Sequence, residues 1–175
     1  MSTLTKSKYL IGLQCPKYLW IIFHESEKIP KATLAEEFKF EQGTQVGQFA
    51  KKLFPKGIDL QTKDYLKNIE DTKKALKEKK SLFEAGFEFN NCFSRADILV
   101  PVKDEWDIIE VKSGTEVKDE NVHDVSFQKY VYENSGLKIR KCFLMHLNKE
   151  YRKKGELNLK ELFVKEDITS KVDKF

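Results

Sequence analysis

The sequence contains no run of apolar residues as long as the ~18 that a membrane span needs. Residues 1–6 lack the apolar segment and small-residue cleavage site of a secretory signal. Cysteine is scarce, and Cys15, Cys92 and Cys142 are odd in number and far apart. This argues against a disulfide framework and for a reducing compartment. These absences predict a cytoplasmic protein that does not enter a membrane.

What the chain does contain is typical of one soluble globular domain. Its 175 residues are 40% hydrophobic and 34% charged, so it can bury a core and is not expected to be disordered. The net charge of +4 is too small to indicate nucleic-acid binding by itself. We divide the domain into a helical entry region (1–33), an α/β core (34–168) and a tail (169–175).

The periodicity of apolar residues predicts alternating helices and strands. Helices are expected at 5–13, 16–24, 34–54, 65–80 and 119–134. Strands are expected at 58–61, 82–89, 92–102, 106–111, 139–147 and 162–168. This order predicts an α/β fold with a mixed sheet flanked by helices and an N-terminal helical extension.

Two strand-like segments carry charged residues among apolar ones. Asp97 lies within 92–102, and Glu110 and Lys112 end the next strand. Carboxylates buried in a sheet are costly unless a positive charge lies between them. Hard oxygen ligands beside a lysine suit magnesium-dependent phosphodiester chemistry.

A turn at Asn90–Asn91 would align the first two of these strands. A two-residue hairpin there, a favoured use of asparagine, pairs Phe89 with Cys92. Counting back along both strands then places Glu84 opposite Asp97.

A second turn, at 103–104, would align the third strand. It pairs Val102 with Glu105 and so places Asp97 opposite Glu110, with Lys112 on the same face. Opposed side chains lie ~5 Å apart at Cβ, close enough for several carboxylates to share one ion. The alternative is that Asp97 simply pairs with a neighbouring Arg or Lys.

These residues resemble the motifs of the PD-(D/E)XK nuclease superfamily, in its RecB-like branch related to CRISPR-associated nucleases. Asp97 is similar to the family aspartate, and Glu110-Val111-Lys112 to the E-x-K element. Gln128 and Tyr132 resemble the helical Q-x-x-x-Y signature. The resemblance implies a restriction-endonuclease-like fold and a nuclease that hydrolyses DNA, single- or double-stranded, in repair, recombination or foreign-DNA processing.

The resemblance also implies a role for each of these residues. Asp97, Glu110 and the carbonyl of Val111 would bind Mg²⁺ or Mn²⁺, and Lys112 would orient or activate water and stabilise charge on the phosphate. Gln128 would act beside them in catalysis. Gln128 and Tyr132 would also contact the nucleic acid.

One departure from the family pattern bears on activity. Gly47 stands where RecB-like nucleases often carry a metal-binding histidine. Either Glu84 substitutes as a ligand, or the site is weaker or inactive. An inactive nuclease-fold module that binds DNA or a protein partner is therefore the alternative function.

A second departure concerns an iron–sulfur cluster. Cys15 resembles the first cluster ligand of some relatives, but Cys92 and Cys142 lie in expected strands, so no complete cluster is expected from this chain. Either a C-terminal region that would begin at the tail is missing, or the lineage lacks the cluster. We favour the first.

Overall fold

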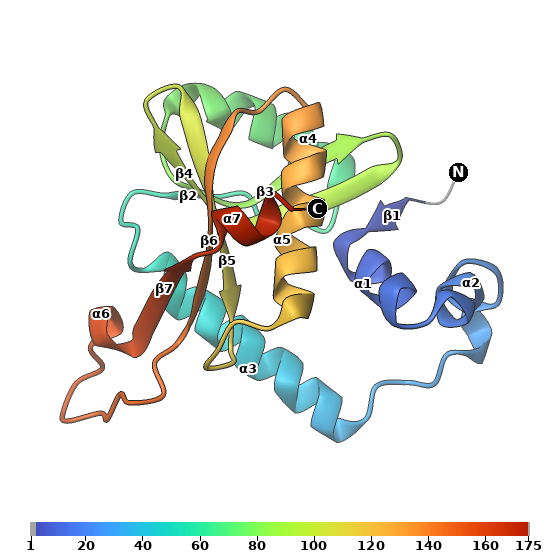
Figure 1. Cartoon of the computed structure of the whole chain (residues 1–175), viewed down its shortest axis with the longest axis horizontal. Coiled ribbons are helices and arrows are strands. Elements are labelled where there is room, and N and C mark those ends of the chain that lie inside the picture. Colours follow the sequence, from blue (N-terminus) through green and yellow to red (C-terminus); the bar gives the residue numbers. More distant parts are fainter. Residues whose placement is uncertain (1–2, 175) are drawn as a thin grey trace.

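A computed structural model describes residues 3–174 and gives an α/β architecture (Figure 1). The helices are α1 (Lys6–Gln14), α2 (Pro16–His24), α3 (Leu34–Lys51), α4 (Tyr65–Ala75), α5 (Asp119–Asn134), α6 (Leu159–Leu162) and α7 (Thr169–Val172). The strands are β1 (Leu4–Thr5), β2 (Ile58–Asp59), β3 (Leu82–Phe89), β4 (Cys92–Val102), β5 (Glu105–Lys112), β6 (Ile139–Leu147) and β7 (Phe163–Asp167). The expected α/β class is confirmed.

The strands form one mixed sheet in the order β2-β3-β4-β5-β6-β7, with β1 paired to β4. The pairs β2/β3, β5/β6 and β1/β4 are parallel, and the remaining neighbours are antiparallel. Within residues 3–174, no helix is long and apolar enough to cross a membrane.

Both predicted turns form with the expected register. Asn90 and Asn91 adopt φ of 49° and 60°, and Phe89 pairs with Cys92. Asparagine tolerates this left-handed region better than most residues, which explains the tight turn. Val102 pairs with Glu105 across the second turn.

Alternate residues of the central strands face two separate cores. Leu99 and Ile108 belong to the core on the α5 face, whereas Ile98 and Ile109 belong to the core that contains Ala50 of α3. This period-two alternation is what a sheet covered by helices on both faces requires. Helices α3 and α5 therefore lie on opposite faces of the sheet.

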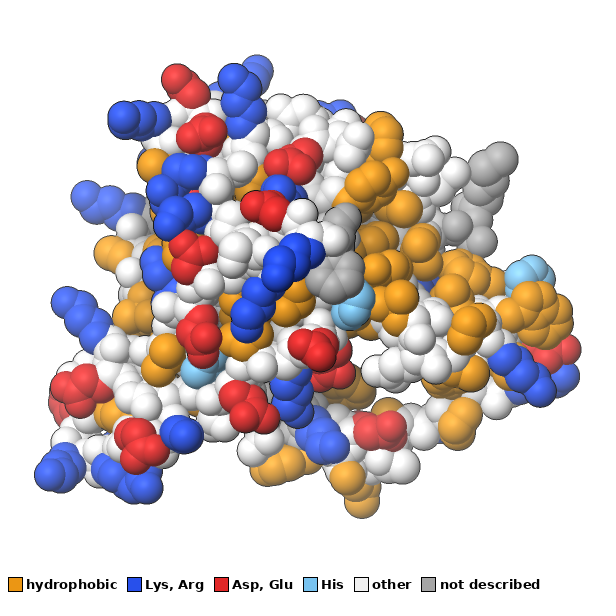
Figure 2. Space-filling view, viewed as in Figure 1, with side chains coloured by type: hydrophobic (Ala, Val, Ile, Leu, Met, Phe, Trp, Pro, Cys, Tyr) orange, Lys and Arg blue, Asp and Glu red, His pale blue; other side chains and the backbone are white. Residues whose placement is uncertain are grey.

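The N-terminal elements are less buried than the sheet. Neither α1 nor α2 contains a buried residue, and hydrophobic side chains gather on the side of the molecule that these helices form (Figure 2). The first half of α3 extends away from the sheet (Figure 1), leaving Phe38 and Phe40 exposed.

Two strands, β1 and β5, pair with the same edge of β4, and a gap separates them. β1 pairs with Cys92 and Phe93 at one end of β4, and β5 pairs from Ile98 onward at the other. Residues 94–97 lie between them, with no strand partner on this edge among the described residues. Asp97 is at the end of the gap next to β5.

Candidate active site

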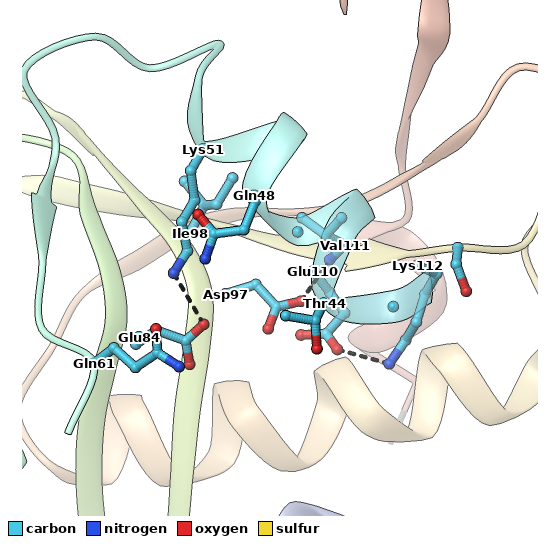
Figure 3. A pocket seen from close by; sticks show the side chains of 13 residues that line it. Thr44, Gln48, Lys51, Gln61, Glu84, Asp97, Ile98, Glu110, Val111 and Lys112 are labelled. Atoms are coloured by element: carbon cyan, nitrogen blue, oxygen red, sulfur yellow. Dashed lines mark hydrogen bonds and ion pairs between the residues drawn. The ribbon is translucent and has the colours of Figure 1, made fainter. Parts of the chain in front are cut away.

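A cavity of about 360 Å³ opens between α3 and strands β3, β4 and β5. Asp97, Glu84 and Lys112 line it from the strands, and Lys51 and Gly47 line it from α3 (Figure 3). Glu110 also lines this cavity. The structure therefore brings together the acidic residues and the lysine that the sequence singled out.

Glu110 is the most constrained carboxylate of the site, with 1% of its surface exposed. Its Oε1 accepts hydrogen bonds from Lys112 Nζ at 2.7 Å and Lys6 Nζ at 2.9 Å. Its Oε2 accepts from Gln128 Nε2 at 2.7 Å and again from Lys6 at 3.0 Å. Two ammonium groups thus supply the positive charge that a buried carboxylate needs.

Asp124 of α5 is a second buried carboxylate beside Glu110. It accepts from Lys112 Nζ at 2.6 Å and from Gln128 Nε2 at 3.1 Å, and its Oδ1 lies 3.4 Å from Lys6 Nζ. Asp124 was not among the residues expected at the site. Its four-residue spacing from Gln128 was the available signal.

Lys6 also belongs to this charged cluster, and no motif in the sequence pointed to it. It directly follows β1, whose parallel pairing of Leu4 with Cys92 brings it to the gap in the β4 edge. Lys6 and Glu110 are 104 residues apart, and the β1–β4 pairing and the packing of Tyr9 on Phe127 bring the two segments together.

The charges of this cluster shift its pKa values in opposite directions. Burial alone would raise the pKa of Glu110, but attraction to Lys112 and Lys6 outweighs it and holds that pKa well below its usual range. Burial likewise opposes the charge of Lys112, and Glu110 and Asp124 overcome it and raise the lysine pKa. Lys112 is therefore protonated at neutral pH.

Asp97 has a different environment. The β4–β5 pairing is registered as far as Ile98 with Ile109, and one residue further Asp97 Oδ2 accepts a hydrogen bond from Val111 N at 2.7 Å. The register puts Asp97 opposite Glu110, as expected, but the two residues form no strand pair. The Asp97 carboxylate instead bonds to the backbone of the next residue, Val111. Burial first, and repulsion from Glu110 second, raise the pKa of Asp97 to about 7.

Glu84 lies where the hairpin count put it. Its neighbours pair in register, Phe83 with Ile98 and Ala85 with Ala96, while Glu84 itself has a φ of 56° that interrupts the ladder. Its carboxylate lines the same cavity as Asp97, and its Oε1 is 3.3 Å from Lys51 Nζ. The strand register is confirmed, and the ligand role stays a prediction.

Gln128 and Tyr132 are fully buried, each with 0% exposure. Tyr132 donates to Gln128 Oε1 at 3.1 Å, and its hydroxyl lies 3.3 Å from Ser94 Oγ. The expected contact of these two residues with a nucleic acid stays a prediction. Gln128 donates to the carboxylates of Glu110 and Asp124, and Tyr132 contacts them only through Gln128.

Two neighbouring carboxylates are the residues of this site that could hold a magnesium-type ion. Among residues 3–174, no group of three or more His, Cys, Asp or Glu side chains is arranged to hold a metal. Mg²⁺ is usually held by one or two carboxylates, with water and substrate phosphate completing its coordination. Asp97 and Glu110 can supply such a pair, with Glu84 and the Val111 carbonyl as the further candidates named from the sequence.

The cysteines occupy three unrelated environments. Cys15 is exposed and caps α2, where its Sγ accepts from Tyr18 N at 3.4 Å. Cys142 is fully buried in the core as expected, and Cys92 is half-buried at its margin.

Comparisons with known proteins add no assignment: no family model matches the chain, and neither does any curated protein.

Proposed function

We propose that this protein is a Mg²⁺- or Mn²⁺-dependent nuclease that hydrolyses DNA phosphodiester bonds, with a restriction-endonuclease-like fold. One observation carries the proposal: Asp97, Glu110 and Lys112, from two adjacent strands, line a single cavity. Two carboxylates can hold a divalent ion, and a fixed ammonium can stabilise negative charge on the reacting phosphate. Repair, recombination or foreign-DNA processing is the proposed setting.

Asp97 and Glu110 would hold the ion, with Glu84 as an added anionic group. The bound ion would supply two effects, lowering the pKa of the attacking water and offsetting the charge of the phosphate. The water gives up one proton to bulk solvent, and its oxygen forms a bond to phosphorus as the bond from phosphorus to the leaving oxygen breaks. The leaving oxygen takes up one proton from bulk solvent.

Lys112 acts as a fixed positive charge in this scheme. Its hydrogen bonds to Glu110 and Asp124 hold the ammonium at the cavity wall, so it need not reorganise when negative charge develops on the phosphate. Gln128 keeps both carboxylates in position through one amide group. Gln128 is therefore a positioning residue.

A cleavage assay tests this function directly. Labelled single- and double-stranded DNA is incubated with Mg²⁺, Mn²⁺ or EDTA and with the wild type, Asp97→Asn or Asp104→Asn. Asp104 is the matched control, since its side chain is 94% exposed in the β4–β5 turn. We expect cleavage only with metal, lost in Asp97→Asn and kept in Asp104→Asn. Cleavage in EDTA, or equal cleavage by both variants, contradicts the proposal.

Two observations favour one alternative, an inactive module that binds DNA or a protein partner. Gly47 provides no ligand from α3, and both oxygens of Glu110 already accept hydrogen bonds from lysines. The same assay separates the two functions, because such a module releases no product under any metal condition.

A further inference from the structure

A second cavity, of about 610 Å³, adjoins the candidate active site. Glu84 and Asp97 line both cavities, so the second begins where the first ends. Its walls come from the start of α1, the first residue of α4 and the unpaired stretch of β4, and they include Lys8, Tyr65 and Arg95. None of these three residues has a part in the chemistry described above.

Two of the cations of this second cavity differ from those of the first. In the first, Lys51 and Lys112 form ion pairs with carboxylates. Lys6 lines the second cavity and also pairs with carboxylates, those of Glu110 and Asp124. In the second, Lys8 contacts Thr3 O and the Phe23 ring, and Arg95 contacts Asn68 and the Phe93 ring. Within residues 3–174, neither Lys8 nor Arg95 has a carboxylate partner.

Arg95 is held so that most of its donors are left for a ligand. Its Nε donates to Asn68 Oδ1 at 3.1 Å, and its Cζ lies 5.6 Å from the centroid of the Phe93 ring. Asn68 is itself fixed, because its Nδ2 donates to the carbonyls of Leu60 and Glu84. A guanidinium fixed through Nε can still present its terminal nitrogens to a phosphate.

Tyr65 adds an aromatic surface to the same cavity. Tyr65 is 44% exposed and is the first residue of α4. It meets Phe93 edge-on, with ring centroids 5.9 Å apart and planes at 71°, so the contact holds the ring without stacking it. Unpaired cations beside an accessible aromatic ring are the combination that binds single-stranded nucleic acids.

We infer that this second cavity is a subsite for the single-stranded flank of a nucleic acid, where Arg95 and Lys8 bind backbone phosphate and Tyr65 stacks on an unpaired base. The inference rests on the proposed nuclease function and specifies its substrate. A strand whose reacting phosphate lies at Asp97 would continue directly into this cavity. Stacking on Tyr65 requires an unpaired base, which favours a single strand over a duplex.

Fluorescence anisotropy with labelled oligothymidylate, in EDTA to prevent cleavage, tests the subsite. We expect Tyr65→Ala to weaken binding roughly tenfold and Tyr65→Phe to preserve it, because stacking needs only the ring. Tyr130→Ala is the matched control: Tyr130 is 47% exposed and meets Phe89 edge-on at 5.9 Å, but it lies outside the cavity. A matched duplex should bind more weakly than the single strand and be indifferent to Tyr65→Ala.

The phosphate contacts are tested by salt dependence. Arg95→Met and Lys8→Met should each reduce the slope of log affinity against log salt by about 0.7, the value for one phosphate contact on a single strand. Lys165→Met is the control for Lys8→Met, since both lysines lie 4.4 Å from a phenylalanine ring centroid. Thermal melts of all variants establish that each is folded.

The outcomes separate this inference from the nuclease proposal. If the wild type cleaves DNA but the cavity variants bind oligothymidylate like the wild type, or no more weakly than the controls, the subsite is overturned and the nuclease proposal stands. If the wild type neither binds nor cleaves, both are overturned. Selective loss of single-strand binding in the cavity variants supports the subsite even if no cleavage occurs.

Discussion

Asp97 and Glu110 lie on adjacent strands, yet their environments make them chemically different. Glu110 accepts hydrogen bonds from two ammonium groups and an amide, and its pKa is lowered. Asp97 accepts one from a backbone amide, and burial with repulsion from Glu110 raises its pKa to about 7. At neutral pH a metal-free site therefore has one fixed anion and one that is readily protonated. A cation beside Asp97 would favour its ionised form.

The raised pKa of Asp97 predicts how metal-free stability depends on pH. The folded state holds this proton up to about pH 7, whereas an unfolded aspartate releases it near pH ~3.9. Between these two pH values the folded protein binds more protons than the unfolded protein. The protonated Asp97 therefore adds to the free energy of unfolding in full below the unfolded pKa, and this stabilisation is lost as pH rises to about 7. Asp97→Asn keeps an oxygen for Val111 N–H and cannot ionise. Between pH 5 and pH 8, we expect the free energy of unfolding of Asp97→Asn to rise by up to a few kcal/mol relative to that of the wild type.

Urea unfolding in EDTA at the two pH values measures this difference. Asp104→Asn is again the control, because its exposed carboxylate should leave the pH dependence unchanged. An Asp97→Asn protein whose stability follows pH as the wild type does would show that Asp97 is ionised in the folded state.

Lys112 should matter far more to the rate than to binding. Replacing it with Met removes the ammonium from Glu110 and Asp124, but Lys6 still neutralises part of their charge. We expect cleavage to fall by ~10²–10⁴-fold, the usual effect of losing an acid–base or positioning group. Metal and oligonucleotide affinity should change much less. Lys141→Met is the control, because Lys141 forms an ion pair with Asp167 on a half-exposed surface and does not line the cavity. If Lys112→Met cleaves at the wild-type rate, Lys112 has no part in catalysis and only pairs with the carboxylates.

At the scale of elements, the site exists because two strands share one edge of β4. β1 and β5 take the ends of that edge, and Lys6, Asp97 and Glu110 meet near the gap between them. Helix α3 closes the cavity from the other side without supplying an acidic or histidine ligand: the residues it contributes are Gly43, Thr44, Gly47, Gln48 and Lys51.

Helix α3 nevertheless has room for a ligand at Gly47. A Cβ added there meets nothing within 4 Å, and the position lines the cavity. We expect Gly47→His to strengthen Mn²⁺ binding more than Mg²⁺ binding, since imidazole favours transition metals. Gly43→His is the control, because position 43 also lines the cavity with free space but lies one turn away. Calorimetry that shows no gain at 47, or the same gain at 43, contradicts this placement of the ion.

At the scale of the whole molecule, the N-terminal segment is part of the site. Lys6 reaches Glu110 and Asp124, and Lys8 lines the neighbouring cavity. The expected helical entry region precedes the α/β core in the chain. Its residues 4–8 nevertheless pair with a core strand, contact core carboxylates and line the second cavity.

Local patterns predicted most of the fold and part of the site. The asparagine turn fixed the pairing of β3 with β4, and from it the position of Glu84 followed by counting. Lys6 could not be predicted, because a two-residue strand pairing across the chain leaves no periodicity in the sequence. The burial of Gln128 and Tyr132 was also hidden, since a helix that packs polar residues against a buried carboxylate looks like one with a solvated polar stripe.

Calorimetric titration with Mn²⁺ measures whether Asp97 and Glu110 hold a divalent cation. We predict saturable binding by the wild type and by Asp104→Asn. In Asp97→Asn and Glu110→Gln the affinity should fall about tenfold or more, because even outer-sphere partners of a metal are worth that much. Glu84→Gln should cause a smaller loss. A wild type without saturable binding, or Asp97→Asn and Glu110→Gln proteins with wild-type affinity, would contradict the account.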